Sequence, residues 1–228
     1  MISVLLPTRG RPEALADSID SLLDNASNQA EVEILLAVDP DESGAYALHD
    51  FSPGVHTWVA PQRFGYARLH EYINFLASKA QGEWLMLWND DARMQTPGWD
   101  KIICSHAADS LPQEVLWPLV NHDAGGNLFP VWPKWWADVM GYVSLSPNND
   151  VWVSEIGRRL GVEARVPVQV FHDRADITGG HNDQTFAEGR ALMMRGNDSA
   201  YDSQVNRVER SRAVRIIRSR MTAERQSR

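Results

Sequence analysis

Residues 83–99 read EWLMLWNDDARMQTPGW, and this stretch decides the fold class. The apolar run over residues 84–88 predicts a buried strand that breaks abruptly into Asn89, Asp90 and Asp91. Adjacent carboxylates beside a core repel each other and lose hydration, and a divalent cation with oxygen ligands would remove that cost. The alternative is a polar strand exit in which both carboxylates are simply solvated.

Two earlier apolar runs also end in polar residues. Residues 2–6 stop at Pro7, and residues 32–38 run into Asp39. Between these two predicted strands, Pro12 suits the first position of a helix. A strand, a helix and a second strand predict a right-handed parallel crossover, so both strands should end at the same edge of the sheet.

The rest of the chain continues this alternation of strands and helices. Short apolar runs predict strands over residues 56–60, 115–120 and 166–171, and helical spacing predicts helices over residues 69–80, 99–108 and 150–160. Further predicted features are a hairpin-like turn over residues 121–127, a glycine-rich loop over 177–183 and a helix that begins near 185. The sequence therefore predicts an α/β fold with a mostly parallel, Rossmann-like sheet flanked by helices.

Single residues mark the ends of two of these helices. Gly82 is predicted to be the C-cap of the helix over residues 69–80, and Gly161 to follow the helix over residues 150–160. Asp150, or an adjacent asparagine, is the natural N-cap of that second helix.

The composition of the chain changes after residue 194. Apolar residues such as Val214 and Ile217 give part of a stripe at helical spacing, and from residue 207 to 228 Glu209 and Glu224 are the only acids among many arginines. We predict a basic, partly amphipathic helix within residues 195–228. The arginines on which this rests are Arg207, Arg210, Arg212, Arg215, Arg218, Arg220, Arg225 and Arg228.

Composition excludes several classes of protein. With 228 residues and 43% hydrophobic content, the chain can build a sizeable core and is not disordered. No apolar run approaches the roughly 20 residues of a membrane span, and the N-terminus reads as a strand rather than a signal peptide. The single cysteine, Cys104, is predicted to lie in the core and fits a reducing cytoplasm. The net charge of −8 argues against a body that binds nucleic acid generally.

Three segments together resemble the family 2 glycosyltransferases, which belong to the nucleotide-diphospho-sugar transferases and have the GT-A fold. They are ISVLLPTRGRPEALADSIDSLL at residues 2–23, LLAVDPD at 35–41 and WLMLWNDDARMQTPGW at 84–99. The resemblance covers the first half of the chain, and NNDVWVSEIGRRLG at 148–161 extends it more loosely. It implies one domain over residues 1–194, with a nucleotide-sugar-binding half over 1–100 and an acceptor half over 101–194.

The resemblance implies a set of donor-binding residues. In the family, the loop after the first strand packs on the nucleotide base and ribose, and the acid after the second strand hydrogen-bonds the base. Here these positions are held by Pro7, Thr8, Arg9 and Asp39. Arg63 and Arg68 are candidates to face phosphate, with ordinary surface arginines as the alternative.

The family's Asp-x-Asp motif, which holds the ribose and a divalent metal ion, corresponds to Asn89, Asp90 and Asp91. Because Asn89 replaces the first acid of that pattern, Asp91 is the expected ligand of Mn²⁺ or Mg²⁺, and Asn89 and Asp90 are expected to contact the donor. His172 ends a predicted strand and is the expected second ligand, with His181 as its rival.

The acceptor half supplies a candidate base and a candidate platform. An inverting transferase needs a base for the acceptor hydroxyl, and family members place an acid at the start of a helix after an aromatic region. Asp150 occupies that position, and an N-cap role is its alternative. The nearby tryptophans that could stack on an acceptor are Trp132, Trp135 and Trp136, although packing in the core is the alternative for them.

The resemblance implies a metal-dependent hexosyl- or pentosyltransferase that uses a UDP- or GDP-sugar and inverts the anomeric centre. The acceptor candidates are another glycan and a modified DNA base. Because Asn89 replaces an aspartate, a second hypothesis is a protein that binds a nucleotide sugar without turnover. A nucleotidyltransferase is disfavoured because the loop over residues 8–11 lacks the glycine-rich pattern with lysine, and no G-x-G-x-x-G supports a dehydrogenase.

The arginine-rich tail leaves two possibilities open. Clustered arginines neutralise phosphates, so the tail suggests a polyanion partner such as nucleic acid. Alternatively, the tail packs on the acidic body or forms a contact within a homo-oligomer.

Overall fold

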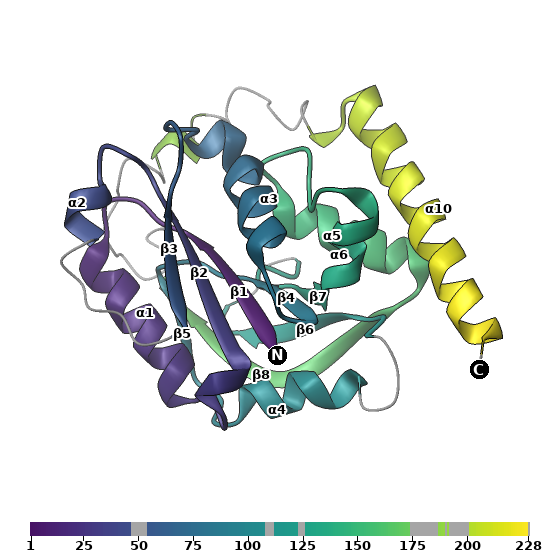
Figure 1. The fold of residues 1–228 in the computed structure, drawn as a ribbon, viewed down its shortest axis with the longest axis horizontal. Helices are drawn as coiled ribbons and strands as arrows, with labels where there is room; N and C mark the ends of the chain where they lie inside the picture. The colour runs from purple at the N-terminus through teal and green to yellow at the C-terminus, as the bar shows by residue number, and fades with distance from the viewer. Residues whose placement is uncertain are drawn as a thin grey trace.

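The computed structural model describes residues 1–46, 54–107, 112–122, 126–173, 187–189, 191 and 201–227. Within these residues, a curled sheet of eight strands is flanked by helices (Figure 1). The strands are β1 (Ile2–Pro7), β2 (Val32–Val38), β3 (Val55–Val59), β4 (Trp84–Leu87), β5 (Ala92–Met94), β6 (Val115–Val120), β7 (Val131–Pro133) and β8 (Glu163–His172). The helices are α1 (Pro12–Asp24), α2 (Ser43–Tyr46), α3 (Leu69–Lys79), α4 (Trp99–Cys104), α5 (Lys134–Met140), α6 (Asn149–Leu160) and α10 (Gln204–Gln226), with short 3₁₀ turns at Gln29–Glu31, Tyr66–Arg68 and Ser105–Ala107.

The first half of the sheet is parallel, as predicted. β1 pairs in parallel with β2 on one side and with β4 on the other, and β3 extends the sheet beyond β2. Leu5 of β1 lies opposite both Leu35 of β2 and Leu87 of β4. Because helices or longer connections return the chain between these strands, all four strands end at the same edge. The predicted α/β class with a mostly parallel sheet is confirmed.

The second half of the sheet mixes strand directions. β7 runs antiparallel to β4 and β6, β8 runs parallel to β6, and β5 pairs antiparallel with β8. The sequence does not predict β5 or β7, because each has three residues and cannot show a repeating pattern. The β5–β8 pairing places Ala92 opposite His172, so it joins the segment after β4 to the end of β8.

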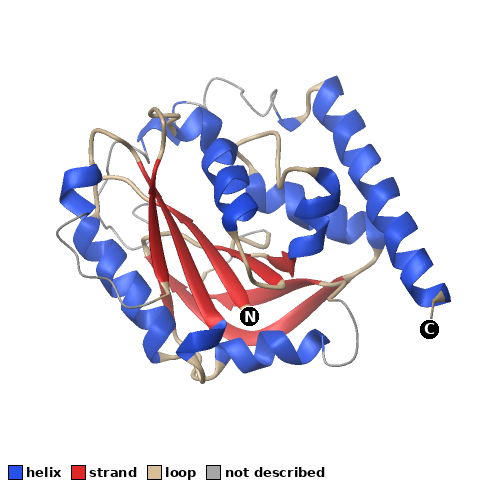
Figure 2. Cartoon of the chain, viewed as in Figure 1, coloured by secondary structure: helices blue, strands red, loops and turns tan. Residues whose placement is uncertain are grey.

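The sheet is covered on both faces, which explains its nearly continuous apolar strands. Val4 and Leu6 of β1 point into one core, together with residues of α1 and α4, while Leu5 points into the other, together with residues of α3, α5 and α6. Figure 2 shows these two helical layers on either side of the strands. Cys104 is partly buried and packs against the first of these cores, as the sequence predicts.

Helix α10 completes the second core. Its residues Ala213, Val214, Ile217 and Met221 are buried in the same cluster as residues of α5 and α6. Figure 1 shows α10 at one side of the molecule, with α1 and α2 at the other. None of the helices that the structure describes has the length and apolar character needed to cross a membrane.

Two helix boundaries differ from their sequence predictions. Helix α3 ends at Lys79 with Ala80 as its C-cap, so the prediction of Gly82 as the C-cap is wrong. Gly82 is instead required by close packing: its N–H donates to Ser3 Oγ at 2.8 Å, and an added Cβ would lie 2.7 Å from Ser3 N. At α6, Asn148 is the N-cap and Asp150 lies in the first turn.

The other end of α6 agrees with its prediction. Gly161 adopts a left-handed conformation with φ of 74° and ends the helix, as the sequence predicts. Some predictions lie outside the described residues. They are the loop over residues 177–183 with His181, most of the helix that begins near 185, part of the turn over 121–127 and the boundary between 194 and 195.

The contact around Gly82 predicts a specific loss of stability. Gly82→Ala should lower the free energy of unfolding by about 1–3 kcal/mol, because the new methyl group overlaps the backbone of β1, which cannot move easily within the sheet. Urea unfolding followed by circular dichroism measures the effect. Gly44→Ala is the matched control, because a Cβ there meets nothing within 4 Å and alanine suits a helix. Equal midpoints for the two variants would contradict the packing role of Gly82.

Candidate functional site

The carboxyl ends of β1, β2 and β4 meet at one edge of the sheet and bring their polar residues into contact. Thr8 Oγ1 donates to Asp90 Oδ2 at 2.7 Å, and Arg9 Nη1 donates to Asp39 Oδ2 at 2.8 Å. Asp39 and Asp90 are each 3% exposed. The structure therefore confirms the prediction that these strands end at one edge of the sheet.

Arg9 forms hydrogen bonds with the acidic loop after β2. Its guanidinium makes two hydrogen bonds to Asp41, at 3.0 and 2.9 Å, besides the bond to Asp39. The hydrogen bonds with Asp41 are the largest cause of the raised pKa of the Arg9 guanidinium. Gly10 N donates to Glu42 Oε2 at 2.7 Å and fastens the β1–α1 loop to the same segment. The loop predicted to contact a nucleotide is thus held in place by charge-assisted bonds.

Tyr72 of α3 holds the other oxygen of Asp39. Its hydroxyl donates to Asp39 Oδ1 and accepts from Phe64 N at 2.8 Å and from Gly65 N at 3.3 Å. Burial, followed by the hydrogen bond to Asp39, raises the pKa of Tyr72 to about 12, so the phenol stays protonated near neutral pH. In the sequence, Tyr72 is only one member of an apolar helical stripe, which gives no sign of this polar role.

Arg11 lies between the adjacent carboxylates of Asp90 and Asp91. Its Nη2 is 3.0 Å from Asp90 Oδ1, and its Nη1 donates to Asp91 Oδ2 at 3.4 Å. The guanidinium therefore offsets part of the repulsion that the sequence attributes to these two acids. This role is not evident from the sequence, because Arg11 has the position of a turn residue before Pro12.

Asp91 and His172, the two predicted metal ligands, face each other. His172 Nε2 lies 3.3 Å from Asp91 Oδ1, and His172 is 5% exposed. That contact has an ion-pair distance but not hydrogen-bond geometry, so Asp91 Oδ1 is a buried oxygen without a hydrogen bond from any residue described here. Burial acts to raise the pKa of Asp91, but His172 and the charge of Arg11 outweigh it and lower that pKa.

His122 and Asn121 surround His172 from the end of β6. His122 Nε2 is 3.3 Å from His172 Nδ1, and Asn121 Oδ1 accepts from His172 N at 2.8 Å. Neither residue is among the predicted site residues. Their position directly after a predicted strand is the sequence signal for them, because parallel strands that end together place the residues after them at one edge.

The remaining predicted donor residues lie at the rim. Arg63 Nε is 4.0 Å from Asp39 Oδ2 and its guanidinium also pairs with Glu188, whereas Arg68 pairs with Glu71 at 2.9 Å. Asn89 is exposed, and its carbonyl oxygen, not its side chain, accepts from Ser18 Oγ at 3.3 Å. Pro7 ends β1 opposite Ala37 of β2.

Asp150 is carried by α6, a different element from the one that carries the acid pair. It lies in the first turn of α6, and burial raises the pKa of its carboxyl group. The Asp150 side chain is only partly buried. A raised pKa makes its carboxylate a stronger base than an ordinary aspartate, which is a property that a general base needs.

The structure corrects the predicted aromatic platform. Trp132 and Trp136 are each 1% exposed and belong to the second core, so neither can stack on an acceptor. Both tryptophans are buried because β7 pairs with β4 inside the sheet and α5 packs against α3. Trp135 is partly buried, and its Nε1 donates to Pro112 O at 2.7 Å, so it also serves packing.

The chemical types of the side chains at this position suit a divalent cation. Asp91 offers a carboxylate oxygen to which no residue of the described ranges donates a hydrogen bond, and His172 offers an imidazole nitrogen beside it. Within the described ranges, no group of three or more His, Cys, Asp and Glu side chains is arranged to hold a metal.

Comparison with solved structures shows the same fold. The crystal structure of S. aureus TarS superposes with a TM-score of 0.57 at 11% identity and covers 90% of this chain and 44% of that chain. The structure of TarS 1-349 gives a TM-score of 0.53 at 11% identity, and its complex with UDP gives 0.52 at 12% identity. Each of these two covers 76% of this chain and 58% of that chain. The chain thus spans about half the length of these structures.

Sequence comparison finds a family model that matches the N-terminal part of the chain. No curated protein matches the chain. Residues 3–112, however, match the model of Glycosyl transferase family 2, and this region contains β1, β2, β4 and the acids at their ends. The N-terminal half of the chain is therefore family 2 glycosyltransferase-like in sequence, as its motifs predict, and the fold is GT-A-like.

Proposed function

We propose that this chain transfers a sugar from a nucleoside-diphosphate donor to a hydroxyl group. The observation that carries the proposal is that Thr8, Asp39, Asp90 and Asp91 follow parallel strands that end at one edge of the sheet, where Thr8 bonds Asp90 and Arg11 lies against both Asp90 and Asp91. Ligands of open α/β sheets bind at this edge. The family match over the same residues and a UDP complex among the similar folds support the proposal.

Asp39 is the candidate contact for the nucleotide base. Its carboxylate is fixed from two sides, by the Tyr72 hydroxyl and by Arg9. A fixed carboxylate can accept N–H groups of a uracil or guanine ring without reorganising, which suits a UDP- or GDP-sugar. Arg63, which lies near Asp39 at the rim, is in reach of a diphosphate.

Asp91 and His172 are the candidate ligands of Mn²⁺ or Mg²⁺. When bound, such an ion would neutralise the charge that grows on the departing diphosphate. For His172 Nε2 to act as a ligand, its ring proton must sit on Nδ1, and Nδ1 lies 3.3 Å from His122 Nε2, which can accept that proton's hydrogen bond. His122 would then fix the tautomer of His172.

Asp150 is the candidate base for an inverting single displacement. The hydroxyl proton of the acceptor passes to the Asp150 carboxylate while the acceptor oxygen bonds to the anomeric carbon. The bond between that carbon and the diphosphate oxygen breaks, and the nucleoside diphosphate leaves with the electron pair. Burial raises the pKa of Asp150, which makes its carboxylate a stronger base than an exposed aspartate.

One observation favours a second function, namely binding of a nucleotide sugar without turnover. Arg11 already lies against both Asp90 and Asp91, and Asn89 takes the place of a third acid. If Arg11 keeps these positions when a donor binds, it can neutralise the diphosphate itself and leave no role for a metal ion. Nucleotide binding that is independent of Mn²⁺, without donor hydrolysis, would identify this second function.

A thermal-shift screen tests the donor site and the metal ligand together. UDP and GDP are added with and without Mn²⁺, and we expect one nucleotide to raise the unfolding temperature more strongly when Mn²⁺ is present. Asp91→Ala should remove the Mn²⁺-dependent part of the shift. Asp138→Ala is the control, because it removes an exposed carboxylate from α5. A Mn²⁺-dependent shift that persists in Asp91→Ala would rule out Asp91 as the ligand.

Asp150→Asn separates catalysis from binding and from stability. We expect turnover, measured as release of nucleoside diphosphate from a UDP- or GDP-sugar, to fall about 10²-fold or more, with the nucleotide's thermal shift unchanged. Burial raises the folded-state pKa of Asp150, so the folded protein is stabilised by the protonated form and loses that stability as pH rises through the folded-state pKa. Asparagine is uncharged and similar in size, so it resembles the protonated form of Asp150.

Asp150→Asn should therefore unfold at a higher temperature than the natural chain at pH 7, and this gain should shrink at pH 4. Asp138→Asn, an exposed carboxylate, should change neither rate nor stability appreciably. Full turnover in Asp150→Asn would exclude Asp150 as the base.

A further inference from the structure

The proposed function does not use the arginines of α10. This helix carries seven arginines and two glutamates and no lysine or aspartate, so its formal charge is +5. Because the whole chain has a charge of −8, the remainder carries −13. Figure 1 shows α10 on the side of the molecule away from α2 and the β1–α1 loop, so these arginines do not belong to the donor site.

One of these arginines serves the fold. Arg210 is 2% exposed, and its Nε lies 3.0 Å from Glu155 Oε2 of α6. Its Nη1 donates to Tyr201 O at 2.6 Å, and its guanidinium lies 3.8 Å from the centre of the Tyr201 ring. Together with the buried apolar residues of α10, Arg210 fixes the helix to the body of the protein. This agrees with the prediction that the tail packs on the acidic body. The position of the other arginines is set by this attachment.

Four exposed arginines form a stripe along the outer face of α10. Arg207, Arg215, Arg218 and Arg225 fall within about 80° of helical arc and span about 27 Å along the axis. We call these four residues the arginine stripe. The two glutamates of the helix point elsewhere: Glu209 contacts Arg212 at 3.2 Å, and Glu224 accepts from Gln113 at 3.2 Å.

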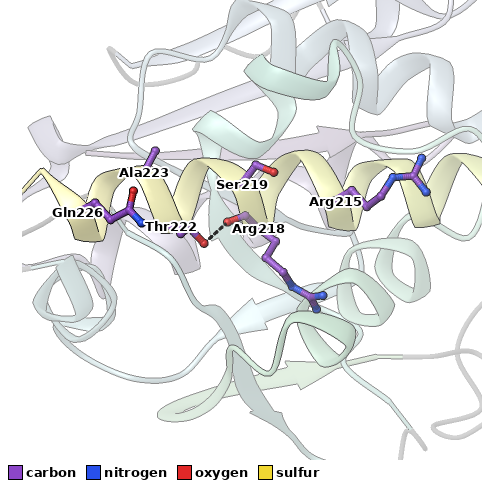
Figure 3. A pocket seen from close by; sticks show the side chains of 6 residues that line it. All are labelled: Arg215, Arg218, Ser219, Thr222, Ala223 and Gln226. Carbon is purple, nitrogen blue, oxygen red and sulfur yellow. Dashed lines mark hydrogen bonds between the residues drawn. The ribbon is translucent and has the colours of Figure 1, made fainter.

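The middle of the arginine stripe borders a shallow pocket. This pocket has a volume of about 520 Å³ and is shown in Figure 3. The residues that line it are Arg215, Arg218, Ser219, Thr222, Ala223 and Gln226, all of them from α10. A hollow lined by one helix cannot enclose a small molecule, but it can receive part of an extended ligand. Arg218 also donates to Arg159 O at 2.9 Å, which steadies its side chain against α6.

We propose that the arginine stripe binds the phosphate backbone of double-stranded DNA. A guanidinium group can donate two parallel hydrogen bonds to the oxygens of one phosphate. The arginine stripe is about 27 Å long, so it matches a linear polyanion rather than a single phosphate. α10 contains no aromatic residue, and single strands are bound chiefly by stacking on aromatic rings, so a duplex fits better. The apolar face of α10 is buried in the core, which argues against insertion into a lipid surface.

Fluorescence anisotropy with a duplex of about 25 base pairs and mixed sequence tests the proposal on the full chain. Two variants have the same composition and the same net charge. Arg215→Gln with Arg218→Gln changes the stripe, and Arg212→Gln with Arg220→Gln changes two arginines of α10 outside it. The stripe variant should bind about tenfold more weakly and should reduce the slope of log Kd against log salt concentration by about 2. The control variant should bind nearly as the natural chain does.

Three results would overturn the proposal. Equal losses in the two variants would show that net charge alone is sensed. No binding of the natural chain at low salt would show that the stripe has no affinity for DNA. Tighter binding to single-stranded DNA, to polyglutamate or to anionic vesicles than to the duplex would assign the stripe to another partner. Circular dichroism melts confirm that both variants remain folded.

Discussion

The parallel pairing of β1 with both β2 and β4 is the constraint on which the rest of the structure depends. It forces three chain segments, far apart in sequence, to leave the sheet at one edge. Each segment begins with residues that form hydrogen bonds or carry charge, so Thr8, Asp39 and Asp90 are brought together by backbone geometry before any side chain contributes. The β5–β8 pairing then adds His172 from a distant part of the chain.

Placing several acids at one edge requires compensating charge, and the chain supplies it from the β1–α1 loop. Arg9 neutralises the acids after β2, and Arg11 neutralises those after β4. Both arginines lie in the same short turn before α1, so one loop balances two acidic segments.

The sequence predicts the fold and the first half of the site well, for a physical reason. Buried parallel strands are continuous apolar runs, and their ends are marked by abrupt polar residues such as Asp39 and Asn89. The remaining features depend on tertiary contacts. Tyr72 reads as an apolar helix residue, Arg11 reads as a turn residue, and the three-residue strand β7 is too short to recognise, so the burial of Trp132 is not foreseen.

The position of α10 has a consequence for any shortened form of this protein. The helix packs against α6, and its Ala213 and Ile217 lie in the same buried cluster as Trp152 and Ile156 of α6. A chain that stopped before residue 204 would leave this apolar surface in water, and uncovered surfaces of this kind favour self-association. What looks in sequence like a removable charged extension is therefore part of the hydrophobic interior, and trimming it would be expected to give aggregates rather than a smaller working domain.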